Sequence, residues 1–191
     1  MEINIYKELF KNVKNFKLAM RSRLMKELIS FEPIVDKNSK ILILGSMPGK
    51  MSLNKVEYYG NPRNHFWKII FDLFDADFEH HYDKKIEFIK NKGIALWDVI
   101  EKCEREGSLD VNIKNEKSND ITSLLEKNPN IKAIAFNGGK AFDSFRKSIG
   151  FNKFPNLDYI KLPSTSPIPG KNIRTYEEKL KVWEVIKKYL N

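Results

Sequence analysis

Two asparagines stand where a folded chain can present an amide to a ligand. Asn64 directly precedes an aromatic segment with helical spacing, and Asn137 follows a short aliphatic segment and precedes Gly138 and Gly139. An amide accepts and donates hydrogen bonds at the same time, so it can hold a water molecule or contact the edge of a nucleobase. Each asparagine also has a structural interpretation, as a helix cap for Asn64 and as a strand-end turn residue for Asn137.

A third candidate is the segment ILILGSMPGK at residues 41–50, in which four aliphatic residues lead into a turn framed by glycine and proline. A phosphate-binding loop has the pattern G-x-x-x-x-G-K-[ST], whose hydroxyl binds magnesium. Gly45 and Gly49 are one residue too close for this pattern, and Met51 stands where the hydroxyl is needed. Nucleotide hydrolysis is therefore not expected.

Positioning these groups requires a scaffold, and the sequence supplies alternating aliphatic and amphipathic segments. Aliphatic runs beginning at residues 41, 93, 131 and 158 are typical of strands covered on both faces. Helical patterns occupy residues 65–74, 84–90, 118–130, 140–149 and 175–190. The order predicts an α/β fold, a three-layer sandwich with a central four-stranded parallel sheet flanked by helices. Functional groups in such sheets gather beyond the carboxyl ends of the strands, so the turns GSMPG, NGG and PSTSP should converge on one crevice.

Composition limits the classes of function. The single cysteine, Cys103, allows no internal disulfide and no multi-cysteine metal site, which fits a cytoplasmic protein. His80 and His81 lie in a polar segment without an accompanying ligand set, so no metal site is expected. No apolar run reaches the roughly 18 residues of a membrane span. The net charge of +9 favours nucleic acid as a partner, although lysine-rich solvated surfaces are common in other proteins.

The first thirty residues differ from the rest in pattern. Apolar residues recur at helical spacing over residues 3–29, with lysines and arginines between them. This predicts a basic helical N-terminal extension at residues 1–31, ahead of a single domain at residues 32–191. The extension can contact DNA or simply cover the domain.

Five motifs, taken in order, resemble a known family. GSMPG, YYGNPRNHFWKI, GIALWDV, FNGGKAF and LPSTSP are similar to those of the uracil-DNA glycosylase superfamily, and most closely to its hypoxanthine-DNA glycosylase (deoxyinosine glycosylase) branch. The resemblance covers roughly residues 32–190. It departs from the family in the segment SPIPGKN and at Met47, which stands where the superfamily carries its water-activating residue.

The resemblance implies a monofunctional DNA glycosylase of base excision repair. Such an enzyme hydrolyses the N-glycosidic bond of a deaminated base flipped out of DNA, with hypoxanthine as the first substrate and uracil as the second. It implies no cofactor, and as the partner double-stranded or single-stranded DNA carrying a damaged base, with no membrane and a monomeric protein. A thioether cannot activate water, so the alternative is a catalytically inactive nucleic-acid-binding module of the same fold.

The resemblance also implies roles for individual residues. Asn64 and Asn137 would be catalytic, and Tyr59 would stack on the flipped base, with Tyr58 as the alternative. Asp98 could orient a neighbouring group. The residues expected to bind the base are Gly45, Ser46, Met47, Pro48 and Tyr59. The residues expected to bind DNA are Ser164, Thr165 and Ser166, through phosphates, and Ile168 and Pro169, as a wedge in the gap left by the flipped nucleotide.

Overall fold

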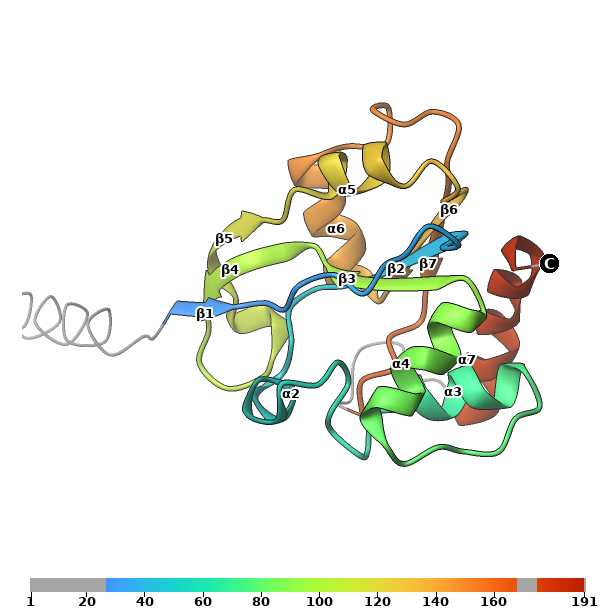
Figure 1. Ribbon diagram of the computed structural model, residues 1–191. Coiled ribbons are helices and arrows are strands. Elements are labelled where there is room, and N and C mark those ends of the chain that lie inside the picture. The colour runs from blue at the N-terminus through green and yellow to red at the C-terminus, as the bar shows by residue number, and fades with distance from the viewer. Residues whose placement is uncertain (1–26, 168–174, 191) are drawn as a thin grey trace, which may run out of the picture.

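The fold is seen in a computed structural model that describes residues 27–167 and 175–190. Its centre is a four-stranded, all-parallel sheet in the order β3-β2-β6-β7. The strands are β2 (Ile41–Gly45), β3 (Ile94–Asp98), β6 (Ala133–Asn137) and β7 (Asp158–Leu162). The predicted α/β fold with a central four-stranded parallel sheet is confirmed (Figure 1).

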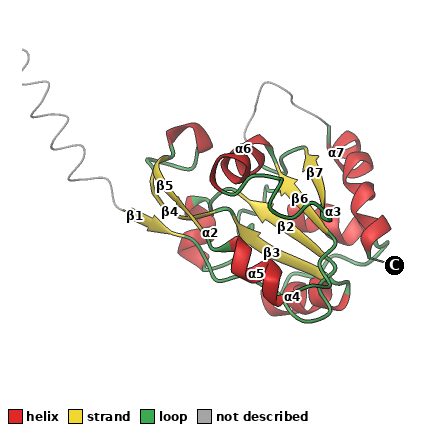
Figure 2. Ribbon diagram, turned by 90° about the horizontal axis from the view of Figure 1, so that it is seen from above, coloured by secondary structure: helices red, strands yellow, loops and turns green. Residues whose placement is uncertain are grey.

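Helices cover both faces of this sheet because its strands are apolar on both sides. In β2, Ile41 and Ile43 belong to one hydrophobic cluster and Leu42 and Leu44 to the other, as the two-residue period of a strand requires. Helices α3 (Phe66–Leu73), α4 (Tyr82–Asn91) and α7 (Tyr176–Trp183) pack in the first cluster. Helices α5 (Ile121–Lys127) and α6 (Gly139–Ser148) pack in the second, on the opposite side (Figures 1 and 2).

The remaining helices are short. Helix α2 (Lys50–Lys55) follows the GSMPG turn, and two 3₁₀ helices, η1 (Asp110–Asn112) and η2 (Glu184–Tyr189), lie after β4 and after α7. Helix α7 begins with a capping box. The Thr175 hydroxyl accepts from the Glu178 amide, and the Glu178 carboxylate accepts from the Thr175 amide.

A second, antiparallel sheet was not predicted. It contains β1 (Glu27–Ile29), β4 (Ile100–Glu104) and β5 (Lys114–Ser118) in the order β1-β4-β5. The predicted helix over residues 3–29 is wrong at its end, because residues 27–29 pair with β4. The rest of that predicted helix, up to residue 26, lies outside the described residues. Within the described ranges, no helix is both long enough and apolar enough to cross a membrane.

Candidate active site

A cleft of about 380 Å³ opens beyond the carboxyl ends of the parallel strands. The three loops expected to converge do so, because GSMPG follows β2, NGG follows β6 and PSTSP follows β7 along one edge of the sheet. The predicted site residues that line the cleft are Gly45, Ser46, Met47, Pro48, Tyr59, Asn64, Asn137, Ser164, Thr165 and Ser166. Ile168 and Pro169 lie outside the described residues.

The GSMPG loop is held by its carbonyl groups. The backbone N–H groups of Val99 and Ile100 donate to the carbonyls of residues 45 and 46, at 2.9 and 3.1 Å. The buried guanidinium of Arg105 donates to the next two carbonyls, those of residues 47 and 48. Four consecutive carbonyls are therefore satisfied by the segment that contains β4, which fixes the loop backbone beside the cleft.

Met47 supports this loop from beneath. Its side chain is 6% exposed and belongs to a small apolar cluster with Ile100 and Cys103. A thioether packs well in such a cluster and offers only a weak hydrogen-bond acceptor. Met47 therefore borders the cleft without supplying a group that can hold water.

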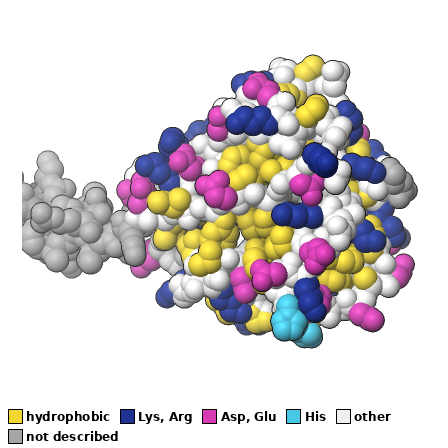
Figure 3. All heavy atoms as spheres, viewed as in Figure 1, with side chains coloured by type: hydrophobic (Ala, Val, Ile, Leu, Met, Phe, Trp, Pro, Cys, Tyr) yellow, Lys and Arg dark blue, Asp and Glu magenta, His cyan; other side chains and the backbone are white. Residues whose placement is uncertain are grey.

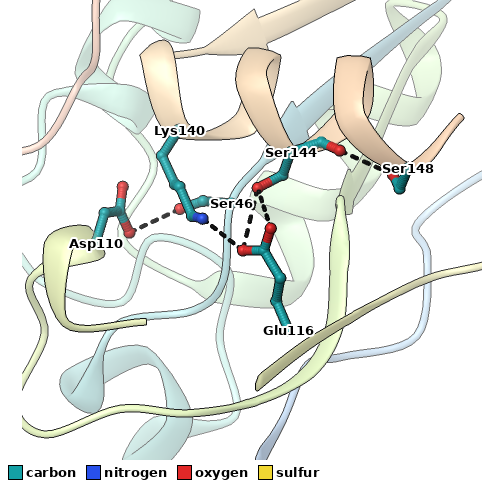
Figure 4. Close-up of polar contacts among 6 residues, drawn as sticks. All are labelled: Ser46, Asp110, Glu116, Lys140, Ser144 and Ser148. Carbon is teal, nitrogen blue, oxygen red and sulfur yellow. Dashed lines mark hydrogen bonds and ion pairs between the residues drawn. The ribbon is translucent and has the colours of Figure 1, made fainter. Parts of the chain in front are cut away.

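Polar contacts attach the second sheet to the wall of the cleft (Figure 4). The Ser46 hydroxyl donates to Asp110 Oδ1 at 2.9 Å. In the same region, Glu116 of β5 accepts from Lys140 Nζ and from the Ser144 hydroxyl, both on α6. The Glu116–Lys140 pair is partly shielded from solvent, so it links β5 to the helix that begins at the NGG turn.

Asn64 keeps part of its amide available to the cleft. Its Oδ1 accepts from the Phe66 N–H at 2.9 Å, which is the kind of helix-start contact its sequence position suggested. Oδ1 has a second lone pair, and no described residue is bonded to Nδ2. The N-cap of α3 is His65, so the interpretation of Asn64 as the helix cap is wrong by one residue. Its contact with the first helical residue still fixes the amide in one orientation at the cleft.

Asn137 is occupied at both ends of its amide. Its Oδ1 accepts from the Thr165 N–H, and its Nδ2 donates to Thr165 Oγ1, each at 2.9 Å. Thr165 is 0% exposed, and its carbonyl accepts from the His65 N–H at 3.0 Å. A phosphate contact by the Thr165 side chain does not fit this geometry, because the side chain is buried and joined to Asn137. Through these contacts, Asn137 and Thr165 connect β6 to the PSTSP loop and to the start of α3.

Ser164 and Ser166 remain at the surface of the PSTSP loop. Ser164 is exposed, Ser166 is half-buried, and the Ser166 N–H donates to Ser164 Oγ at 3.2 Å. Gly138 has φ of +98°, and a Cβ there would lie 3.0 Å from the Ser164 Cβ. Glycine is therefore needed for the NGG turn to pass this close to the loop.

The two neighbouring tyrosines have different surroundings. Tyr58 also borders the cleft, but it is buried. Its hydroxyl donates to the Glu32 carbonyl, and its backbone carbonyl accepts from Trp67 Nε1, so the ring is held in the core. The ring of Tyr59 stacks on Phe66, with 3.7 Å between the centroids and 18° between the planes, and borders the cleft. Burial raises the pKa of Tyr59 most, and the nearby Asp98 raises it further, while a hydrogen bond with Asn137 lowers it. Tyr59 is accordingly a neutral donor and an aromatic surface at the cleft.

Asp98 is the cleft residue whose role the sequence left open. It ends β3, is 5% exposed and lies in register with Gly45 of β2. Its Oδ2 is buried and has no hydrogen-bond partner among the described residues. Burial raises the pKa of Asp98 to about 7, with Asp110 acting in the same direction and Arg105 in the opposite one. The WDV sequence at a strand end was the available signal, but only the strand register reveals its depth.

Apolar side chains at the rim were also missed. Leu109 and Val111, which border the cleft, are 43% and 87% exposed. On the face shown in Figure 3, hydrophobic side chains gather in the middle, and lysines and arginines are interspersed with acidic residues. Five of the nine net positive charges fall in residues 1–26, which contain seven Lys and Arg against two Glu. Charge alone therefore does not mark the described part as a DNA-binding surface.

No group of three or more His, Cys, Asp or Glu placed to hold a metal ion occurs among the residues that the structure describes. The groups that line the cleft are amides, hydroxyls, the two tyrosine side chains, the buried carboxyl of Asp98, and the exposed side chains of Lys50 and Asp110.

Known proteins share this fold and sequence. The sequence model of the "Uracil DNA glycosylase superfamily" matches residues 32–187. Two relatives named "Hypoxanthine DNA glycosylase" are similar to the chain. That of Methanosarcina acetivorans is 36% identical over 159 residues, which are 82% of this chain and 95% of the relative. That of Methanosarcina barkeri is 38% identical over 124 residues, which are 63% of this chain and 78% of the relative.

A solved structure agrees with these matches. A solution NMR structure from Methanosarcina acetivorans, described as a candidate uracil DNA glycosylase, has a TM-score of 0.73 and 34% sequence identity with this chain. The similarity covers 86% of this chain and 99% of the other. Because the family match includes the whole parallel sheet and every described loop of the cleft, the chain belongs to the uracil DNA glycosylase superfamily.

Proposed function

We propose that the protein is a monofunctional DNA glycosylase that removes deaminated bases from DNA, with hypoxanthine as its first substrate and uracil as its second. The observation that carries this is the cleft itself, in a chain similar along most of its length to hypoxanthine DNA glycosylases. Its volume is near the lower end of ligand pockets, which span roughly 300–1,000 Å³, and suits one flipped nucleotide.

Hydrolysis of a base–sugar bond passes through an oxocarbenium-like state. The enzyme must hold a water molecule beneath C1′ and stabilise the charge that develops on the departing base. Asn64 is the proposed water-holding residue, because the contact with Phe66 fixes its amide at the cleft and leaves hydrogen-bonding capacity unused. The water oxygen bonds to C1′ as the bond from C1′ to the base breaks, the electron pair of that bond stays with the base, and the proton that the water loses neutralises the departed base.

The other residues place the nucleotide. The base is proposed to stack on the side of Tyr59 that faces away from Phe66, a contact of the kind that contributes about 1–3 kcal/mol. Ser164 and Ser166 are the proposed contacts to flanking phosphates. Asn137 is proposed to act by holding Thr165, because both ends of its amide are occupied there.

The enzyme is proposed to be a monomer in the cytoplasm and to act on double-stranded or single-stranded DNA. Comparing excision from the two DNA forms, and light scattering of the protein alone and with DNA, would test these statements. A stable dimer would remove the monomer from the proposal.

A second candidate is a nucleic-acid-binding module that has lost catalysis. It is favoured by the packing of Met47, which leaves the first-motif position without a water-holding group. Under this alternative, the protein binds damaged and undamaged DNA and leaves both intact.

Alkali cleavage of a labelled duplex separates the two candidates. After incubation with a duplex containing one deoxyinosine, alkali should cut the strand at that position, because only excision leaves an abasic site. Duplexes containing uracil, xanthine or the normal base form the matched panel, and we expect hypoxanthine to be removed fastest. Intact strands for every lesion would exclude a glycosylase and favour the binding module.

A further inference from the structure

Asp98 lies on the floor of the cleft. It stands at the carboxyl end of β3, paired in register with Gly45, and is almost completely buried while still bordering the cleft. A flipped nucleotide enters base first, so the floor meets the base and the mouth meets the sugar and the phosphates. A group at the depth of Asp98 therefore contacts the base and not C1′.

The carboxyl of Asp98 lacks the partners that buried polar groups normally have. Its Oδ2 accepts no hydrogen bond from a described residue, although leaving a buried polar atom unpaired destabilises the folded protein. That destabilisation is relieved when a ligand supplies the missing hydrogen bond. The unpaired atom therefore indicates a contact that forms only when the cleft is occupied.

The strand next to Asp98 is shaped to make room for this carboxyl. A Cβ at position 45 would lie 2.3 Å from Asp98 Oδ1, a distance that real Cβ atoms do not reach. Only glycine allows the carboxyl to occupy its position beside the GSMPG loop. This close approach is a second observation, independent of the missing hydrogen bond.

We propose that Asp98 recognises the flipped base as a neutral carboxylic acid, accepting a hydrogen bond from the ring N1–H of hypoxanthine and donating one to the adjacent O6. The inference rests on the proposed function, because it assigns a role within that reaction. A carboxylic acid presents one acceptor and one donor side by side, which matches an N–H next to a carbonyl. The donated proton also stabilises the negative charge that collects on the base as it leaves.

The surroundings of Asp98 favour its neutral form. Burial and the nearby Asp110 raise its pKa to about 7, while Arg105 opposes them. Tyr58 and Tyr59 also face Asp98, and both are neutral because their own pKa values are raised. DNA adds phosphate charges near the cleft, which disfavour ionisation of Asp98 further.

The sign of the pH dependence follows from this proton. Below its pKa, Asp98 carries the proton that bonds O6. As pH rises through the pKa, the carboxyl loses that donor and places a negative charge beside O6 and the departing base. The pKa of Asp98 is about 7 in the free protein, and bound DNA raises it further, so excision should fall with rising pH above about pH 7.

Two substitutions test the role, measured as single-turnover excision of hypoxanthine between pH 6 and 9. Asp98→Ala should lower excision by about 100-fold or more, the effect typical of a lost group that stabilises transition-state charge. Asp98→Asn should retain activity within about 10-fold and lose the decline at high pH, because an amide has the same acceptor and donor without the titrating proton. Circular dichroism and thermal melting verify that each variant is folded.

Asp110→Asn provides a third measurement. It removes the neighbouring charge, keeps an acceptor for Ser46, and should move the falling limb of the pH profile to lower pH. Two results would overturn the role of Asp98: an Asn variant as inactive as the Ala variant, or wild-type excision that rises with pH, since both mean that the ionised carboxylate is required. If the wild-type protein excises no hypoxanthine at any pH, the proposed function itself fails.

Discussion

Replacing Asn137 by alanine should destabilise the protein in a way that can be calculated from two contacts. The substitution removes both 2.9 Å hydrogen bonds to Thr165, a residue with no exposed surface. Each buried group left unpaired costs about 1–3 kcal/mol. The Thr165 hydroxyl can rotate toward another partner, so we expect about 3 kcal/mol in total. For a chain of this length, that corresponds to a fall in Tm of about 6–12 °C.

The loss of activity should accompany this loss of stability. Without Asn137, the PSTSP loop is no longer fixed to β6, and excision should fall because the phosphates of the substrate are held less precisely. Thermal unfolding followed by circular dichroism and single-turnover excision at a temperature well below Tm measure the two effects separately.

Asn137→Asp is the matched control. Its carboxylate still accepts from the Thr165 N–H, and the Thr165 hydroxyl can turn to donate to the second oxygen. The aspartate variant should therefore recover most of the Tm lost in the alanine variant. An alanine variant with an unchanged Tm and excision reduced by about 100-fold or more would refute the reasoning, because it would mean that Asn137 contacts the substrate directly.

Four other perturbations have expected outcomes. Asn64→Ala should lower single-turnover excision by about 100-fold and cost only about 1 kcal/mol of stability, with the Kd for DNA nearly unchanged because no charge is removed. Gly45→Ala should lower both Tm and excision, since a Cβ would collide with Asp98 Oδ1, and normal values for both would contradict that close approach. Deleting residues 1–26 should preserve excision and make DNA binding less salt-dependent, with a slope shallower by about 0.9 for each phosphate that the shortened protein no longer neutralises. A chain starting at residue 30 also lacks β1 and should melt at a lower temperature.

The sequence predicted the central sheet because its strands have strong local signals. The aliphatic run of β2 is buried on both faces, and α7 begins with a capping box, so the pattern and the structure coincide there. Strands β4 and β5 are largely polar and show no clear alternation, and β1 continues an apparently helical pattern. Their pairing depends on contacts between distant segments, which a local pattern does not contain.

The same distinction applies to the site. The convergence of three loops follows from a parallel sheet, so it could be predicted once the strands were known. The environment of each residue could not. The close approach of Gly45 and Asp98 depends on the β2–β3 register, and the bonds between Asn137 and Thr165 depend on β6 and β7 being neighbours. These relations decide which amide is free and which carboxyl is buried.

Because of the hydrogen bonds made by Thr165, the choice of base and the rate of attack by water depend on different parts of the cleft. Thr165 lies in the chain between Ser164 and Ser166, the serines proposed to hold phosphates. Its carbonyl accepts from the His65 N–H, and His65 directly follows Asn64 at the start of α3. The distance from phosphate to water is therefore set by the protein, while the distance from phosphate to C1′ is the same in every deoxynucleotide. Any base that enters the cleft has its C1′ at the same point beside the water. Discrimination between one lesion and another then depends on the floor, where changes at Asp98 can alter the choice of base without moving the water.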